Sequence, residues 1–234
     1  MSEAALVCTG IDGLDEMLGG GVPENHAIAL LGACGTGKTT FGLQFTWKGL
    51  QSGENCVFIS LEEEVESIVT NARIFGWDIE PYIRSKKLSI VKLNPADAKN
   101  TVMKIKSELP RFLKAFDTKR VVLDSVSLFS MMFPDAAEKR IRLFELHQLI
   151  KKSGATAFLT AEVKDENPLN SKDGLVEYVA DGVIILQFTE PKDTREMTLN
   201  LRIMKMRRLP HSRKIKPYRI TGKGIVVHSE LEVF

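Results

Sequence analysis

The chain has 234 residues, which suits one large domain, and its 44% hydrophobic content is typical of a globular protein with a sizeable core. The net charge of +2 gives no bulk argument for binding nucleic acid or an acidic membrane surface, and three cysteines are too few for a disulfide framework. The four histidines show no metal-ligand spacing, and neither a signal-peptide pattern nor an apolar run of about 18 residues occurs. We therefore expect a soluble, reduced protein of the cytoplasm without a membrane span.

The first predicted elements in chain order are a strand and a helix joined by a glycine-rich loop. The strand is the apolar run 27–31, and the helix spans residues 39–50. Between them, residues 32–39 read Gly-Ala-Cys-Gly-Thr-Gly-Lys-Thr, which fits the pattern G-x-x-x-x-G-K-[ST] of a phosphate-binding P-loop. The alternative is an ordinary glycine-rich turn, but strand, loop and helix in this order are the context that the motif requires.

Each part of this loop suits a charge on a nucleoside triphosphate. Glycines let the backbone point several N–H groups at phosphate oxygens, and the helix adds the positive end of its dipole. Lys38 brings a positive charge to the outer phosphates, and the Thr39 hydroxyl can bind Mg²⁺. The predicted contacts to the nucleotide are Gly35, Thr36, Gly37, Lys38, Thr39 and Thr40.

Strands and helices continue to alternate along the chain after the P-loop. Strands are predicted at 56–61, 88–93, 120–124, 156–161 and 182–187, and helices at 63–75, 97–116 (with a kink or break at Pro110) and 137–152. This rhythm favours an α/β fold, with a mostly parallel sheet flanked by helices. The pattern then changes, because residues 197–206 alternate and short strands at 218–221 and 225–228 surround a Gly-Lys-Gly turn. These last strands predict a C-terminal antiparallel extension at the sheet edge.

Carboxylates follow two of the predicted strands. Asp124 ends an apolar strand, as a Walker B aspartate does when it orients Mg²⁺ beside a P-loop, and a helix cap is the alternative. Glu62 and Glu63 follow the strand 56–61, where one carboxylate can accept a proton from a water that attacks the γ-phosphoryl group. Alternatively, residues 62–64 form a solvated acidic first turn of the next helix, and spacing alone does not decide between these two interpretations.

A pair of cations stands at the end of the alternating strand. Lys205 and Arg207 are two positions apart, so their side chains share one face. Because the P-loop already contains Lys38, a neighbouring subunit's nucleotide is the more interesting target, as for an arginine finger acting in trans. The alternative is a general basic patch that binds nucleic acid or another polyanion, since further cations follow closely. These are Arg208, Arg213, Lys214, Lys216 and Arg219.

Further segments extend the pattern over nearly the whole chain. They are Thr-Gly-Ile-Asp-Gly-Leu-Asp at 9–15, Leu-Gly-Gly-Gly-Val-Pro at 18–23, Phe-Ile-Ser-Leu-Glu-Glu at 58–63, Asn-Ala-Arg-Ile-Phe-Gly-Trp-Asp at 71–78 and Glu-Tyr-Val-Ala-Asp-Gly-Val-Ile at 177–184. Together with the P-loop, the Asp124 strand and Lys-Met-Arg at 205–207, this ordered set resembles the KaiC-type domains of the RecA superfamily. The resemblance implies one such domain over residues 1–234, with a RecA-like P-loop NTPase core.

The resemblance also implies a homo-oligomeric ring, a hexamer, with ATP and Mg²⁺ bound between subunits. It implies catalytic roles for Glu62 and Glu63 at the attacked phosphate, together with Lys38, and places Ile74 near the base. Contacts to the neighbour's nucleotide would come from Lys205, Met206, Arg207, His211, Thr221 and Gly222. Glycine usually follows the Lys-x-Arg element in the family, whereas this chain has Arg208, and no copy of KaiC's autophosphorylated Ser/Thr pair is evident, so self-kinase activity is not expected.

The predicted function is therefore slow, Mg²⁺-dependent ATP hydrolysis in a ring whose nucleotide state regulates an unknown protein partner. One alternative is a non-catalytic nucleotide-binding module of a larger assembly, which could dispense with Glu62 and Glu63. The other is a RecA-like DNA recombinase or motor that uses the basic segment 202–219, which the near-neutral net charge disfavours. DNA is accordingly not the expected partner.

Overall fold

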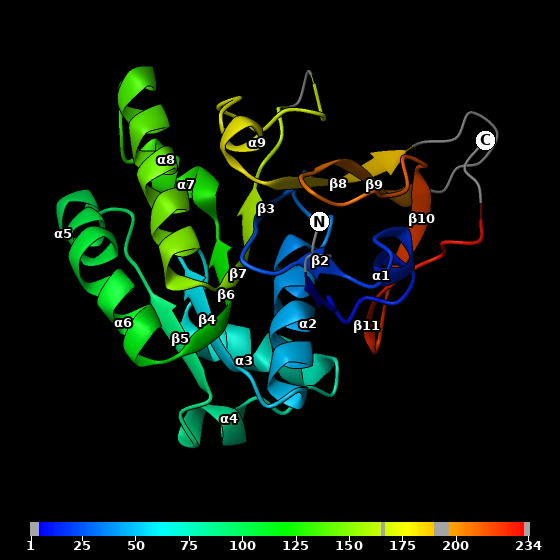
Figure 1. Ribbon diagram of the computed structural model, residues 1–234, viewed down its shortest axis with the longest axis horizontal. Coiled ribbons are helices and arrows are strands. Elements are labelled where there is room, and N and C mark those ends of the chain that lie inside the picture. Colours follow the sequence, from blue (N-terminus) through cyan, green and yellow to red (C-terminus); the bar gives the residue numbers. More distant parts are fainter. Residues whose placement is uncertain (1–4, 165–166, 190–196, 232–234) are drawn as a thin grey trace.

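The fold is described by a computed structural model, which covers residues 5–164, 167–189 and 197–231. Within these residues, nine strands form one sheet in the order β11-β10-β9-β8-β3-β7-β6-β4-β5 (Figure 1). The parallel strands are β3 (Ala27–Gly32), β4 (Asn55–Ser60), β5 (Leu88–Lys92), β6 (Thr118–Asp124), β7 (Thr156–Ala161) and β8 (Gly182–Thr189). The antiparallel strands are β9 (Thr198–Met206), β10 (Lys216–Thr221) and β11 (Gly224–Val227). The predicted fold class is confirmed.

Helices cover both faces of this sheet (Figure 1). The longest are α2 (Lys38–Gln51) and α8 (Ala136–Ser153); the others are α1 (Leu14–Met17), α3 (Val65–Ile74), α4 (Glu80–Arg84), α5 (Ala98–Met103), α6 (Leu109–Ala115), α7 (Val126–Met131) and α9 (Val176–Val179). No helix of the described residues combines the length and the apolar character that crossing a membrane requires. A separate small sheet pairs β1 (Leu6–Val7) with β2 (Val22–Pro23).

The alternation of side chains along β3 divides the core into two layers. Ile28 and Leu30 pack with α2 and α3 residues on one face, whereas Ala27, Ala29 and Leu31 pack with α6, α7 and α8 residues on the other. Because successive side chains of a strand point to opposite faces, a strand that is buried on both faces is apolar throughout. This explains the continuous apolar run that precedes the P-loop.

The predicted helix 97–116 is present, with its irregularity just before Pro110. α5 and α6 are joined by a π-helical turn at Lys104–Glu108, and Pro110 lies in the first turn of α6. Proline has no N–H, and its ring would clash with the carbonyl of Lys106 four residues earlier in a regular α-helix. The wider turn relieves that clash, as π-bulges do elsewhere.

The directions of the strands place the P-loop and the end of β9 at opposite ends of the sheet. The parallel strands end on the side of the P-loop, which follows β3. β9 runs the opposite way to β8, with Thr198 opposite Thr189 and Met206 opposite Gly182. Since Gly182 is also the partner of Ile28 at the start of β3, the last residues of β9 lie at the far end from the P-loop.

Candidate active site

The P-loop between β3 and α2 is closed by hydrogen bonds from its last residues to the carbonyls of its first residues. The Lys38 ammonium donates 2.9 Å hydrogen bonds to the carbonyls of both Gly32 and Ala33. The Thr36 hydroxyl donates to the Ala33 carbonyl as well, at 2.8 Å. α2 begins directly after Gly37, so the positive end of the helix dipole and the Lys38 charge lie together at the loop. This arrangement can hold the phosphates of a nucleotide.

The C-terminal hairpin supports the loop from one side. Gly37 has a φ of 86°, and a Cβ at this position would lie 2.7 Å from Ile220 Cδ1 of β10, so only glycine fits. Tyr218 of the same strand is buried, and its hydroxyl donates a 2.6 Å hydrogen bond to the Thr36 carbonyl. Burial raises the pKa of Tyr218, so the phenol stays a neutral donor. Nothing in the sequence marks Tyr218, because one aromatic residue in a short strand forms no motif.

Thr39 and Asp124, the two residues for which the sequence predicts magnesium binding, meet beside the P-loop. Thr39 Oγ1 donates a 2.7 Å hydrogen bond to Asp124 Oδ2, and the other carboxylate oxygen accepts from the Thr160 hydroxyl at the end of β7. Hydroxyl and carboxylate oxygens are hard ligands, which Mg²⁺ combines with phosphate oxygens and water. Among the described residues, no three His, Cys, Asp or Glu side chains gather into an all-protein metal site. The donor set therefore fits Mg²⁺ that is shared with a phosphate.

Asp124 is not a helix cap, which was the alternative. The residue that caps α7 is Ser125, whose hydroxyl accepts from the Leu128 N–H at 3.5 Å. Ser125 follows Asp124 through a cis peptide bond and also donates to Glu62 Oε1 at 2.9 Å. The end of β6 thus places a buried carboxylate and a hydroxyl at the site.

Glu62 and Glu63 lie in the loop between β4 and α3. The helix begins at Val65, Glu64 occupies its N-cap position, and Glu66 is the acidic residue of its first turn. The alternative interpretation, an acidic first turn, therefore does not hold for Glu62 and Glu63. Both carboxylates lie in the loop after β4, at the end of the sheet that carries the P-loop.

The two carboxylates have different surroundings. Glu62 is exposed and accepts the hydrogen bond from Ser125, whereas Glu63 is half-buried and accepts a 2.7 Å hydrogen bond from the Asn71 amide. Burial raises the pKa of Glu63, and the negative charges of Asp124 and Glu62 raise it further. The Asn71 hydrogen bond acts in the opposite direction. The site therefore contains three neighbouring carboxylates with unequal access to solvent.

Lys205 and Arg207 lie at the far end of the sheet from their own P-loop. The Lys205 ammonium donates a 2.8 Å hydrogen bond to the Glu177 carbonyl, and Arg207 Nη1 lies 3.3 Å from Asp181 Oδ1. Burial lowers the pKa of Lys205, and the charge of Arg207 lowers it further. Arg208 follows with a φ of 62°, the left-handed region in which glycine is favoured. The geometry keeps both cations away from the phosphate site of the same chain.

The remaining candidate residues fall at both ends of the sheet. Met206 is buried at the end of β9, and His211 follows in the next loop, half-buried. Thr221 ends β10 and Gly222 follows it, at the end that carries the P-loop, because β10 packs on that loop. Ile74 ends α3 with 68% of its surface exposed, so its side chain is free for a ligand.

Known proteins resemble this chain over nearly the whole of its described length. The family model "ATPase: KaiC" matches residues 7–232. The UPF0273 protein of Thermotoga maritima is 34% identical over 95% of both chains. A crystal structure of a KaiC-like protein from Pyrococcus horikoshii has 34% identity and a TM-score of 0.85, with 96% of this chain and 99% of that chain covered. The circadian clock protein KaiC3 of Synechocystis is 32% identical over 94% of this chain, which spans 45% of KaiC3. The chain therefore belongs to the KaiC family of ATPases in the RecA superfamily.

Proposed function

We propose that the chain binds ATP with Mg²⁺ at its P-loop and hydrolyses it slowly in a homo-oligomeric ring, a hexamer, whose nucleotide state regulates a protein partner. Membership of the KaiC ATPase family supports nucleotide binding and ATPase activity. The observation that carries the proposal is the 2.7 Å contact between Thr39 and Asp124, beside the Lys38 ammonium. A hydroxyl, a carboxylate and an ammonium in this arrangement match the needs of a triphosphate with its metal ion.

Binding would use groups that now contact one another. Lys38 would exchange its bonds to the loop carbonyls for bonds to the outer phosphates. Thr39 and Asp124 would hold Mg²⁺, which when bound neutralises charge on the phosphates. Ile74 would pack near the base. The resemblance assigned Thr221 and Gly222 to the neighbour's nucleotide, but they follow Ile220, which lies against Gly37 of their own P-loop, so we propose instead that they contact the nucleotide of their own chain.

Hydrolysis requires a base for the attacking water, and we assign that role to Glu62. Its side chain is exposed, and Ser125, the residue after Asp124, holds one of its oxygens. The other oxygen is therefore free to accept a proton from water. Glu63 is half-buried and accepts a hydrogen bond from Asn71 of α3, so we assign it a supporting role: it adds negative charge to the site and connects the loop after β4 to that helix.

A ring would complete the site with cations from the next subunit. Lys205 and Arg207 share one face of β9 at the end opposite their own P-loop, where a second copy can approach. They would neutralise charge that develops on the γ-phosphoryl group, with Met206 and His211 beside them. Without this contribution each chain would bind ATP but turn it over far more slowly.

One cation of the basic segment is withheld from DNA, because Lys216 is buried and its ammonium donates to the Leu231 carbonyl. Lys205 and Arg207 already have a proposed target in the nucleotide of the next subunit. The test of the proposal is ATP turnover with and without single-stranded DNA, alongside the mass in solution. Turnover by an oligomer without DNA stimulation supports it; turnover that requires DNA supports a recombinase-like motor, and binding without turnover a non-catalytic module.

A further inference from the structure

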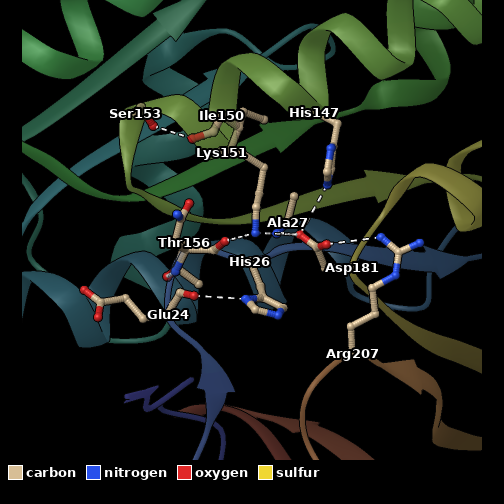
Figure 2. A network of polar contacts seen from close by, with 11 residues as sticks. Glu24, His26, Ala27, His147, Ile150, Lys151, Ser153, Thr156, Asp181 and Arg207 are labelled. Atoms are coloured by element: carbon tan, nitrogen blue, oxygen red, sulfur yellow. Dashed lines mark hydrogen bonds and ion pairs between the residues drawn. The ribbon is translucent and has the colours of Figure 1, made fainter. Parts of the chain in front are cut away.

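Asp181 forms the centre of a polar network at the far end of the sheet (Figure 2). The residue lies just before β8, and its side chain is only 9% exposed. Its carboxylate lies 3.2 Å from the Lys151 ammonium, 3.2 Å from His147 Nε2 and 3.3 Å from Arg207 Nη1. It also accepts a 3.1 Å hydrogen bond from the Ala27 N–H. Four groups from three parts of the chain thus fix one carboxylate.

Arg207 is attached to Asp181 at two points. Its N–H donates a 3.0 Å hydrogen bond to the Asp181 carbonyl, and its Nη1 contacts the Asp181 carboxylate. Its side chain is nevertheless 50% exposed. A guanidinium has five N–H donors on a rigid plane, so one contact with Asp181 leaves donors for an anion from outside. The network therefore holds one part of Arg207 and presents the rest to solvent.

The carboxylate is ionised in spite of its burial. Burial acts to raise the pKa of Asp181, but hydrogen bonds from His147, the Ala27 N–H and Lys151 outweigh it and hold the pKa below its ordinary value. Its negative charge also acts on Lys205, whose pKa it raises against the lowering effects of burial and of Arg207. Asp181 is thus a fixed negative charge that contacts Arg207 and acts on Lys205 as well.

We propose that Asp181 is a positioning residue for the trans-acting cations. His147 and Lys151 of α8 hold the Asp181 carboxylate, which in turn aligns Arg207 toward the nucleotide of the next subunit. The inference rests on the proposed function, because it assigns a role within the shared site. It explains why a buried carboxylate is surrounded by so many donors while its arginine partner stays half exposed.

The test uses Asp181→Asn, which keeps the size of the side chain and an acceptor for the Ala27 N–H. Displacing a catalytic group by about 1 Å can cost about 100-fold in rate, so we expect kcat to fall about 10- to 100-fold. The Kd of Mg·ATP should change less than about twofold, because the P-loop lies at the other end of the sheet. Asp173→Asn is the matched control, since Asp173 is 19% exposed and paired with Lys139 at 3.0 Å; its kcat should be unchanged.

Mixed rings separate positioning from general damage. Asp181→Asn mixed with Lys38→Ala should be more active than the two variants measured separately, since the intact P-loop of the first then faces the intact cations of the second. Asp181→Asn mixed with Arg207→Ala should be no more active than the two variants measured separately, because both lack a fully working finger. A chain that carries both Asp181→Asn and Arg207→Ala should have the same kcat as Arg207→Ala alone, as expected when one residue acts through the other. Asp181→Glu, which keeps the charge that Lys151 needs, serves if the Asn variant does not fold, and should behave in the same way.

Three results would overturn the inference. These are an unchanged kcat of the Asp181 variants, failure of these variants to complement Lys38→Ala while Arg207→Ala does complement it, and an added loss in the double variant. Failure of Arg207→Ala itself to complement Lys38→Ala, with subunit exchange demonstrated by mass, would refute the shared site and the inference with it. The two failures are therefore distinguishable.

Discussion

The Thr39 hydroxyl donates a 2.7 Å hydrogen bond to the Asp124 carboxylate, and this contact joins two residues that are 85 positions apart. It connects the first turn of α2 to the end of β6. Thr39 comes shortly after β3, and Asp124 ends β6; in the sheet, β7 lies between these two strands. Because parallel strands end on the same side, the sheet brings together two residues that are far apart in the sequence.

The first prediction concerns nucleotide binding by Lys38. Lys38→Ala should abolish tight Mg·ATP binding, because each lost hydrogen bond to a charged group costs about 1.5–3 kcal/mol, or about tenfold or more in affinity. Calorimetry measures the loss. Lys119→Ala, which removes an exposed lysine paired with Asp117, is the control and should bind normally. Unchanged affinity of Lys38→Ala would refute the P-loop assignment.

The second prediction separates the two glutamates. Glu62→Gln keeps the size of the side chain but cannot accept a proton, so kcat should fall about 10²- to 10⁴-fold with Mg·ATP binding intact. Glu63→Gln should lose much less, and the double variant should resemble Glu62→Gln. Phosphate release and calorimetry together give these values. If Glu63→Gln shows the larger loss of kcat, the roles assigned to the pair are reversed.

The third prediction is a pH dependence of stability. The pKa of Glu63 is raised in the folded protein, so the folded state binds this proton more tightly than the unfolded chain does. Ionisation of Glu63 therefore reduces stability at neutral pH. Glu63→Gln should raise Tm at pH 7 to 8, and the gain should vanish as the pH falls through the raised pKa and below the ordinary value of about 4.3.

The control for this pH effect is Glu66→Gln. Glu66 is exposed in the first turn of α3, where a negative charge favours the helix dipole. Its substitution should leave Tm unchanged or lower at neutral pH. Thermal melts between pH 4 and pH 8 compare the two variants, and equal behaviour would mean that the surroundings of Glu63 do not penalise its charge.

The fourth prediction concerns the support that Tyr218 gives to the loop. Tyr218→Phe leaves the Thr36 carbonyl without its donor in a buried place, which should cost about 1–3 kcal/mol of unfolding free energy. Affinity for Mg·ATP should fall several-fold, because the loop loses a fixed point. Tyr82→Phe is the control, since its ring packs on Trp47 away from the P-loop. Denaturant unfolding and calorimetry measure both effects, and a Tyr218→Phe protein that matches the wild type would exclude a supporting role.

Periodicity predicted the long elements well but not the short ones. All nine predicted strands and all four predicted helices occur within about two residues of their expected bounds, because buried strands and capped helices carry local signals. Asp135, for example, accepts a 2.9 Å hydrogen bond from Glu138 at the start of α8, and Gly154 ends that helix at a φ of 80°. The missed elements are β1, β2, α1, α4, α7 and α9. The two strands have two residues each and the helices have six or fewer, which is less than two turns and too short to show a helical period, whereas the predicted short strands stand out as apolar runs or beside a glycine turn.

The candidate site shows the same limit. The motif residues Lys38, Thr39 and Asp124 were predicted because their chemistry depends on fixed spacing or on a strand end. Tyr218 and Thr160 were not, because they reach the site through the pairing of distant strands. Contacts that depend on tertiary placement leave no pattern in a single sequence.

The fifth prediction concerns a site shared between subunits. Lys205 and Arg207 lie at the far end of the sheet from the P-loop of their own chain, so a monomer lacks the two cations that would add to Lys38 in neutralising charge on the γ-phosphoryl group. Such fingers contribute about 10³- to 10⁵-fold in other NTPases. ATPase activity should therefore rise more than proportionally with protein concentration as rings assemble.

Complementation between two inactive variants tests the shared site directly. Lys38→Ala and Arg207→Ala should each be inactive, and their mixture should regain activity. Random assembly at equal amounts leaves about a quarter of the interfaces with an intact P-loop facing an intact finger. Arg213→Ala, from the same basic segment, is the control and should stay active alone, since a general basic patch would lose function equally at either arginine. If exchange of subunits is shown by light scattering and no activity returns, Lys205 and Arg207 serve contacts within their own subunit.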